Sequence, residues 1–212
     1  MLDEALKEQI KKKFSKELKG DVKLILFGKE NECTFCLEYN ELVEELAALS
    51  DKISAEHYPV SSPKAKEHGI ELAPSLLIYS PEHKTSAAFC GPPGNHFFPV
   101  LLEDIADASC GVPNISKDLI EKVKAIDFPV KIRVFVSQSC PYCPPAVKVA
   151  HDFSLINPKI HSEMIDGALF QELRQQYRVM GVPKTVINDK IELSGAQPPG
   201  EVLSQILRIK DL

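Results

Sequence analysis

Apolar residues recur at every fourth position at the start of the chain and then give way to short, mainly apolar runs. The residues with the fourfold spacing are Leu2, Leu6, Ile10, Phe14 and Leu18. This spacing predicts a helix with one buried face. The runs at residues 22–27 and 130–136 have the length and composition of buried strands, and a helical pattern follows each of them. The chain is therefore predicted to alternate strands with helices.

The same order of elements is predicted twice. After its strand, the first half should contain a helix to about residue 49, a strand at 53–58, a short helix before Gly69, a hairpin of 76–79 with 87–89, and a helix at 95–108. The second half begins with a helix capped by Ser116. It continues with a strand at 130–136, a helix to about 153, a strand at 160–165, a helix at 169–177, a hairpin of 185–187 with 191–193, and a helix at 200–208.

The turn at residues 111–114 is the predicted boundary between domains 1–112 and 113–212. Each part has about 100 residues, which is an ordinary domain size. Strands alternating with helices and ending in a hairpin predict an α/β fold in which a mixed central sheet is flanked by helices.

A pair of cysteines follows the first strand of each half. The motifs are CTFC at Cys33 and Cys36 and CPYC at Cys140 and Cys143, with leading cysteines 107 residues apart (140 − 33). A proline lies downstream of each, Pro74 at 41 residues (74 − 33) and Pro183 at 43 residues (183 − 140). The matching spacings indicate one structural unit used twice.

This combination resembles a known family. A dithiol between the first strand and its helix, with a proline before the third strand, is the pattern of the thioredoxin fold. Two such units in one chain, the second with CPYC, resemble the glutaredoxin-like protein disulfide oxidoreductases of thermophiles. The resemblance implies two tandem thioredoxin folds that reduce, form or isomerise disulfides in substrate proteins. It also implies that no cofactor is needed beyond the dithiols and that an NADPH-linked thioredoxin reductase supplies electrons.

Thiol–disulfide exchange accounts for these residue types. The attacking group is a thiolate, and a cysteine at the start of a helix is stabilised in that form by the helix dipole. Cys33 and Cys140 are the predicted nucleophiles. A second sulfur three residues further along can attack the mixed disulfide and release the product, which is the predicted role of Cys36 and Cys143.

Further residues are predicted to bind the substrate. Phe35 and Tyr142 should form part of an aromatic surface beside the sulfurs. The family resemblance implies that Pro74 and Pro183 follow cis peptide bonds beside the dithiols. Ala73 and Val182, which precede these prolines, would then pair through their backbone with a bound substrate strand.

The two dithiols are not expected to be equal. Carboxylates at Glu30, Glu32, Glu38 and Glu41 surround Cys33, whereas the nearest downstream charge to Cys140 is Lys148. Because nearby carboxylates disfavour a thiolate, Cys140 should have the lower pKa. Thioredoxins usually carry a buried acid six residues before the leading cysteine, but Phe27 and Val134 occupy those positions. The group that accepts the proton of the second thiol is not identified by the sequence.

Composition and charge restrict the partners. The chain has 44% hydrophobic residues and a net charge of −5, which argues against nucleic acid as a main partner. Residues 1–112 contain 12 Lys and Arg and 19 Asp and Glu, a net charge of −7. Residues 113–212 contain 13 Lys and Arg and 11 Asp and Glu, a net charge of +2. No apolar run approaches the roughly 20 residues of a membrane span, and no signal peptide is recognisable, so a cytoplasmic location without membrane attachment is expected. The sequence does not indicate an oligomeric state.

Several alternatives remain open. A zinc site would space its two cysteine pairs by about 15 to 20 residues, so no metal is predicted. The CTFC site could be inactive and its unit only a platform for substrates. The chain could also be a single-site electron carrier feeding a peroxide-reducing system, or a chaperone-like module whose cysteines take no part. Cys90 and Cys110 are predicted to be unbridged thiols, and the six histidines to be surface or strand residues.

Overall fold

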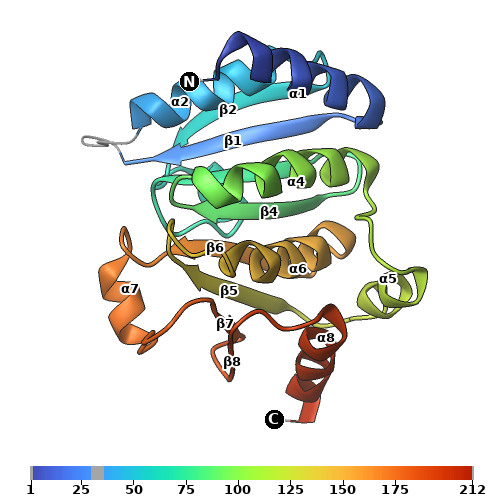
Figure 1. Ribbon diagram of the computed structural model, residues 1–212. Coiled ribbons are helices and arrows are strands. Elements are labelled where there is room, and N and C mark those ends of the chain that lie inside the picture. Colours follow the sequence, from blue (N-terminus) through green and yellow to red (C-terminus); the bar gives the residue numbers. More distant parts are fainter. Residues whose placement is uncertain (1, 30–35, 212) are drawn as a thin grey trace.

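One eight-stranded sheet runs through the whole molecule (Figure 1). The computed structural model describes residues 2–29 and 36–211. The strands lie in the order β2-β1-β3-β4-β6-β5-β7-β8. Each half therefore contributes four neighbouring strands, and the predicted α/β class with two thioredoxin-like units is confirmed.

The elements lie close to their predicted positions. The first half contains α1 (Glu4–Glu17), β1 (Val22–Gly28), α2 (Cys36–Ala47), β2 (Ile53–Pro59), α3 (Pro63–Glu67), β3 (Ser75–Ser80), β4 (Thr85–Cys90), the 3-10 turn η1 (Asn95–Phe97) and α4 (Phe98–Cys110). The second contains α5 (Lys117–Lys124), β5 (Val130–Val136), α6 (Cys143–Ile156), β6 (Ile160–Asp166), α7 (Gln171–Gln176), β7 (Lys184–Ile187), β8 (Ile191–Ser194), α8 (Pro199–Leu207) and η2 (Arg208–Asp211). Ser116 caps α5 as predicted, accepting a hydrogen bond from the Leu119 N–H.

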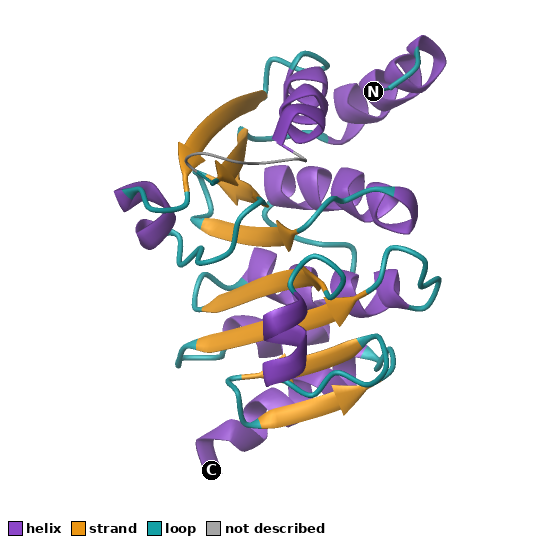
Figure 2. Cartoon of the chain, turned by 90° about the vertical axis from the view of Figure 1, so that its left-hand side faces the viewer, coloured by secondary structure: helices purple, strands orange, loops and turns teal. Residues whose placement is uncertain are grey.

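Strand direction brings the ends of β1 and β5 to one edge of the sheet. β1 and β5 are parallel to β4 and β6, whereas β3 and β7 run the opposite way. The ends of β1 and β5, which precede the CxxC motifs, therefore lie at the same edge as the starts of β3 and β7, which follow the two prolines. Figure 2 looks onto this edge. Four strand spacings separate β1 from β5, or about 19 Å at 4.8 Å each.

The two faces of the sheet are covered differently. The main core packs one face against α1, α2, α4, α5, α6 and α8, and α3 and α7 cover two small separate cores on the other. Alternation along β1 explains the division: Leu24 and Leu26 enter the main core, while Ile25 and Phe27 enter the core under α3. In β5, Lys131 and Arg133 alternate with buried valines and isoleucine and so face the side of α3 and α7.

The halves join where β4 pairs with β6 in parallel, with Ala88 opposite Glu163 and Cys90 opposite Ile165. The sequence predicted a sheet for each half, and the structure adds that the two sheets are continuous. We propose that the two units divide between residues 112 and 113, because the chain leaves α4 through Gly111, which has the left-handed φ of 68°.

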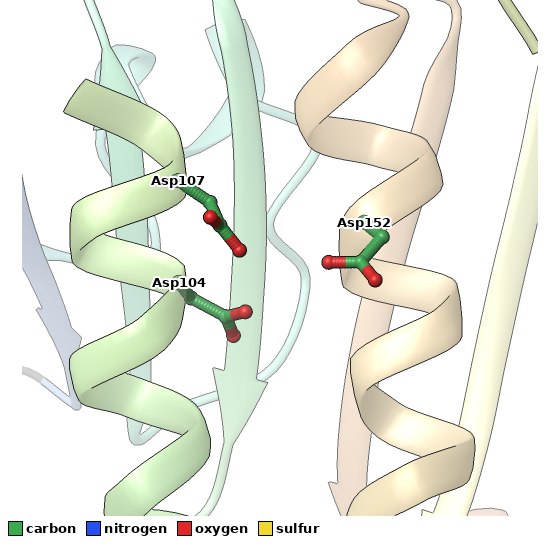
Figure 3. Close-up of side chains that lie close together, drawn as sticks. All are labelled: Asp104, Asp107 and Asp152. Carbon is green, nitrogen blue, oxygen red and sulfur yellow. The ribbon is translucent and has the colours of Figure 1, made fainter. Parts of the chain in front are cut away.

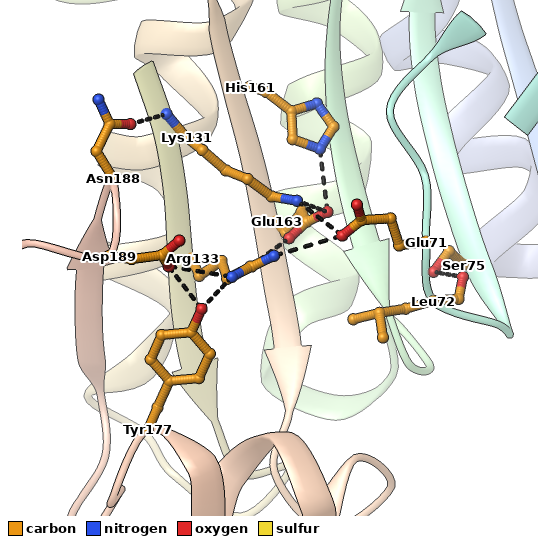
Figure 4. A network of polar contacts seen from close by, with 10 residues as sticks. All are labelled: Glu71, Leu72, Ser75, Lys131, Arg133, His161, Glu163, Tyr177, Asn188 and Asp189. Atoms are coloured by element: carbon orange, nitrogen blue, oxygen red, sulfur yellow. Dashed lines mark hydrogen bonds and ion pairs between the residues drawn. The ribbon is translucent and has the colours of Figure 1, made fainter. Parts of the chain in front are cut away.

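A polar network occupies the α3 and α7 side of this junction (Figure 4). Glu163 is 1% exposed and accepts a hydrogen bond from Arg133 Nε at 3.0 Å, and His161 lies 3.1 Å from its other oxygen. Glu71 of the first half pairs with Lys131 at 3.2 Å. Burial disfavours the Glu163 carboxylate, but His161 and the two cations outweigh this effect and hold its pKa below the ordinary value. The ion pairs of this network thus link the two halves on the face of the sheet where the cores under α3 and α7 are separate.

None of the helices described here combines the length and apolarity that a bilayer crossing requires.

Candidate functional site

The second dithiol lies where β5 leads into α6. Cys140 and Cys143 form a disulfide with their Cα atoms 5.5 Å apart. Cys140 is half-buried, whereas Cys143 begins α6 and is fully buried in the main core. Cys140 is therefore the residue of the pair that an incoming reagent can contact, whereas Cys143 is closed to it. The roles of nucleophile for Cys140 and resolving cysteine for Cys143 stay predictions, and this difference in exposure is the geometry that they require.

The start of α6 differs in one respect from the prediction. The helix begins at Cys143 rather than Cys140, and its next two residues, Pro144 and Pro145, have no backbone N–H. The N–H of Cys143 donates to the carbonyl of Cys140 at 3.4 Å. The helix dipole still points at Cys140, but fewer free N–H donors are available to a thiolate than the sequence argument assumed.

A cis-proline loop faces this disulfide. The Val182–Pro183 peptide bond is cis, and the Val182 carbonyl oxygen lies 3.9 Å from Cys140 Sγ. The buried Pro183 accepts a hydrogen bond on its carbonyl from the Gly195 N–H at 2.8 Å, which fixes the loop to the end of β8. Tyr142, between the two cysteines in the sequence, is 75% exposed. The structure thus brings Cys140, Tyr142 and Val182 together at one surface.

The first site repeats part of this geometry. The Ala73–Pro74 bond is also cis, and the Pro74 carbonyl accepts from the Gly91 N–H at 3.1 Å, as Pro183 does from Gly195. Ala73 and Pro74 are buried. Cys33 and Phe35 lie outside the described residues, and Cys36 is described only as the backbone start of α2.

Strand register reveals that the spacing before the two motifs differs by one residue. Leu26 pairs with the residue two beyond Pro74, and Val134 pairs with the residue two beyond Pro183. Measured from these equivalent positions, Cys33 follows by seven residues (33 − 26) and Cys140 by six (140 − 134). Phe27 and Val134, the positions where thioredoxins carry an acid, are buried in apolar clusters on opposite faces.

Polar contacts join the loop after β4 to α2 and, across the junction of the halves, to the segment before Cys140. Gln138, two residues before Cys140, donates to the Pro92 carbonyl at 2.8 Å and to Asp166 at 3.0 Å. Tyr39 of α2 donates to the Gly91 carbonyl. A side chain at Gly91 would collide with Asp166, since a Cβ there would come within 2.6 Å of it. The loop after β4 is therefore fitted closely between the segments that follow β1 and β5.

Cys90 and Cys110 are unbridged, as predicted. Cys90 is fully buried at the end of β4, and burial raises the pKa of its thiol far above the ordinary value. Cys110 is half-buried and donates to the Glu17 carbonyl at 3.3 Å. A thiol with such a raised pKa, as at Cys90, is a poor nucleophile at neutral pH.

A buried charge cluster between α4 and α6 was not foreseen. Asp104 and Asp107 of α4 point toward Asp152 of α6 (Figure 3), with carboxylate oxygens close enough to hold a metal ion. The ammonium group of Lys148 lies among them, 3.2 Å from Asp104, 2.6 Å from Asp107 and in contact with Asp152. A cation already belonging to the chain therefore neutralises part of the cluster, and nothing else among the described residues there indicates a metal ligand set.

His151 corrects the histidine prediction. It is a helix residue with no exposed surface, and its Nδ1 lies 2.6 Å from Asp104. Its ring also meets Phe89 edge-on at a centroid distance of 4.8 Å. A single sequence pattern could have shown this position: on a helix beginning at 143, residues 147, 150 and 151 share the buried face.

Comparison with known proteins gives the following similarities. A family model described as thioredoxin domain matches residues 130–208. The N-terminal domain of alkyl hydroperoxide reductase AhpF from Enterococcus faecalis (V583) superposes with a TM-score of 0.86 at 26% identity, covering 97% of this chain and all of that one. A protein disulfide oxidoreductase from Aeropyrum pernix K1 superposes with a TM-score of 0.87 at 22% identity, and the match covers 100% of this chain and 95% of that one.

A sequence relative extends the match over the full chain. The alkyl hydroperoxide reductase AhpF of Staphylococcus epidermidis (strain RP62A) is 27% identical over 212 residues, 100% of this chain and 39% of that protein. The chain spans between 30% and 39% of the length of the first curated relatives that it matches.

Proposed function

The chain has the tandem thioredoxin fold found in disulfide oxidoreductases, and from this premise we propose that it catalyses thiol–disulfide exchange on proteins, chiefly through Cys140 and Cys143. The observation that carries the proposal is the pairing of a reachable sulfur at Cys140 with a buried one at Cys143, beside a cis-proline loop. A structural disulfide would have no need for this arrangement, because a bridge over three residues constrains the unfolded chain little.

In the reducing direction, the Cys140 thiolate attacks one sulfur of the substrate disulfide. A mixed disulfide forms and one substrate thiolate leaves. The Cys143 thiolate then attacks the Cys140 sulfur, which releases the second substrate thiol and leaves the Cys140–Cys143 disulfide. Two electrons pass to the substrate, and a dithiol partner such as a thioredoxin reductase must return them. The same steps in reverse oxidise a substrate dithiol.

The remaining assignments complete the proposal. Cys33 and Cys36 form a second redox site. Ala73 with Pro74 and Val182 with Pro183 present extended backbone to the substrate, supported by the buried prolines and their hydrogen-bonded carbonyls. Tyr142 supplies an exposed aromatic surface, and Phe35 the corresponding one at the first site. Disulfide-bearing proteins are the substrates.

A second candidate function is favoured by the relatives. The AhpF similarity covers the whole chain, and those proteins are named as alkyl hydroperoxide reductases. On this interpretation the chain carries electrons from a flavin-containing reductase to a peroxide-reducing enzyme, using Cys140 and Cys143 alone. The difference of one residue before the first motif is consistent with two sites that no longer serve the same purpose.

The two functions separate in a comparison of dithiol-deleted proteins. Insulin reduction by dithiothreitol should be accelerated by the wild-type chain and by Cys33→Ser/Cys36→Ser, but not by Cys140→Ser/Cys143→Ser. The reduction potential of each remaining dithiol is then measured in glutathione buffers. Two defined potentials support the general oxidoreductase, with Cys140 having the lower thiol pKa.

A reversible potential for the Cys140 pair alone supports the single-site carrier. Insulin turnover equal to the uncatalysed rate in all three proteins overturns the enzymatic proposal and favours a module that only binds substrate proteins.

A further inference from the structure

A groove extends from the cis-proline loop to α7. It consists of two adjoining hollows that share Arg178 and Met180. The larger, about 770 Å³, lies against α7 and also contains Arg174. The smaller, about 270 Å³, continues past Val182 and Pro183 to β8. Val182, which lines the smaller hollow, has its carbonyl oxygen 3.9 Å from Cys140 Sγ, so the groove passes close to the disulfide.

The wall of the groove is held in place by the chain itself. Arg178 has a left-handed φ of 47° at the end of α7, and the next residue, Val179, is buried and bonds through its N–H to the Arg174 carbonyl. Lys184, only 9% exposed, donates from Nζ to the Tyr177 carbonyl at 2.7 Å and pairs with Glu192 at 2.8 Å. These contacts hold the segment while Met180 remains 93% exposed.

The groove has an unbalanced charge. Among the described residues, the larger hollow is lined by two arginines and by no carboxylate. Neither Arg174 nor Arg178 forms an ion pair with a described carboxylate, although Arg174 Nε donates to the Val179 carbonyl at 3.3 Å. The carboxylate of the smaller hollow, Glu192, is already paired with Lys184. Guanidinium groups without an ion-pair partner favour carboxylates, which they can bind through two parallel hydrogen bonds.

We infer that this groove selects substrate proteins whose reactive cysteine is flanked by acidic residues in an extended segment. The inference rests on the proposed exchange at Cys140. An apolar side chain of the segment would contact Ala168, Val179 and Met180, and a carboxylate would bind Arg174 or Arg178. Because Arg178 is four residues from Val182, at most about 14 Å of extended chain separates them. The acidic residue should therefore lie within about four residues of the substrate cysteine.

Matched peptide disulfides test this specificity. Three peptides of equal length carry one cysteine in a homodisulfide and differ only at positions three and four from it, where they have Glu, Gln or Lys. The reduced Cys33→Ser/Cys36→Ser protein should reduce the Glu peptide about tenfold faster than the Lys peptide at low salt, with the Gln peptide between them. Raising the ionic strength should reduce the differences between the reduction rates of the three peptides, because salt screens the charges.

Substitutions assign the preference to the groove. In Arg174→Gln/Arg178→Gln the three peptides should react at nearly equal rates. Arg178→Gln alone should reduce the differences between the peptide reduction rates. This variant keeps the hydrogen bond from Arg174 to the Val179 carbonyl. Arg208→Gln, at the other end of the second half and hydrogen-bonded to Gln205, is the matched control and should keep the wild-type order. Equal rates in the parent protein, or an unchanged order in the double variant, would overturn the inference.

A binding measurement keeps this result independent of catalysis. If no peptide is reduced, exchange itself fails, and fluorescence anisotropy of labelled Glu and Lys peptides in which serine replaces the cysteine still decides about the groove. Tighter binding of the Glu peptide that disappears in Arg174→Gln/Arg178→Gln supports the inference. Equal binding of both peptides contradicts it.

Discussion

Replacing Cys143 by Ser should leave the protein covalently attached to its substrates. Cys140 remains reachable and can still attack a substrate disulfide, but the buried sulfur that would resolve the mixed disulfide is gone. Turnover of insulin should stop, and mass spectrometry of the non-reduced product should show one substrate chain per protein, linked to Cys140. The experiment uses a Cys33→Ser/Cys36→Ser background, so that only the second dithiol can react.

The matched variant is Cys140→Ser in the same background. It should neither turn over nor form the adduct, because Cys143 has no exposed surface. Cys90, also fully buried and with a raised pKa, should not take its place. An adduct mapped to Cys143 in this variant would show that α6 opens to admit substrate, and the assignment of the two roles would then be wrong.

The dithiol of the first half can differ from that of the second without loss of the fold. Its cis-proline and the closure of its loop by Gly91 repeat those of Pro183 and Gly195, so the scaffold is retained. The spacing before Cys33 is one residue longer, and acidic residues surround that motif. We expect these sequence features to alter the thiol chemistry more than the packing, so the two reduction potentials are the informative measurement.

Local patterns predicted most of the fold and part of the site. The apolar composition of residues 130–136 predicted a buried strand, and Val130, Ile132 and Val134 of β5 lie in the main core. The fourfold spacing predicted one buried face for α1, and Ile10 and Phe14 lie in the same core. The cis-prolines followed from the family resemblance, and their peptide bonds are cis. Each of these features depends on residues close in sequence or on a motif of fixed spacing, so a single chain contains the necessary information.

Contacts between distant segments were not predictable in the same way. The pairing of β4 with β6 depends on which strand edges remain free after each half has folded, and no residue pattern specifies that choice. Lys148 and Asp107 are 41 residues apart in the sequence, and each alone looks like an ordinary charge on a helix. Arg174 and Arg178 likewise acquire significance only because the cis-proline loop lies beside α7.

Replacing Lys148 by Met should destabilise the folded chain by about 3 kcal/mol at pH 8, because removing one partner of a buried ion pair leaves uncompensated charge. Asp104 is fully buried and Asp152 nearly so, and the Lys148 side chain is 20% exposed. Methionine preserves the length of the side chain, so the loss measures charge rather than a cavity. Urea unfolding of the oxidised wild-type and variant proteins gives the difference in free energy.

The loss should depend on pH in a defined direction. Burial raises the pKa of Asp152 to about 7 in the wild-type protein, and the neighbouring Asp104 and Asp107 add to this effect while Lys148 opposes it. Without Lys148, the folded-state pKa values of Asp107 and Asp152, which burial already raises, move still further above their unfolded values. The folded variant then holds extra protons, so its free energy of unfolding falls as pH rises from about 4 through neutrality. The difference from wild type should be smaller at pH 5 than at pH 8.

A surface lysine provides the control for this prediction. Lys122 pairs with Asp118 at 2.7 Å, but the two side chains are 58% and 76% exposed, and Lys122→Met should cost less than about 0.5 kcal/mol at either pH. If Lys148→Met cost no more than this control, or the same amount at pH 5 and pH 8, the cluster would be hydrated and would not hold α4 and α6 together by charge. If Lys148→Met lowers the free energy of unfolding only at high pH, the role of Lys148 is to neutralise the three carboxylates that meet between the halves.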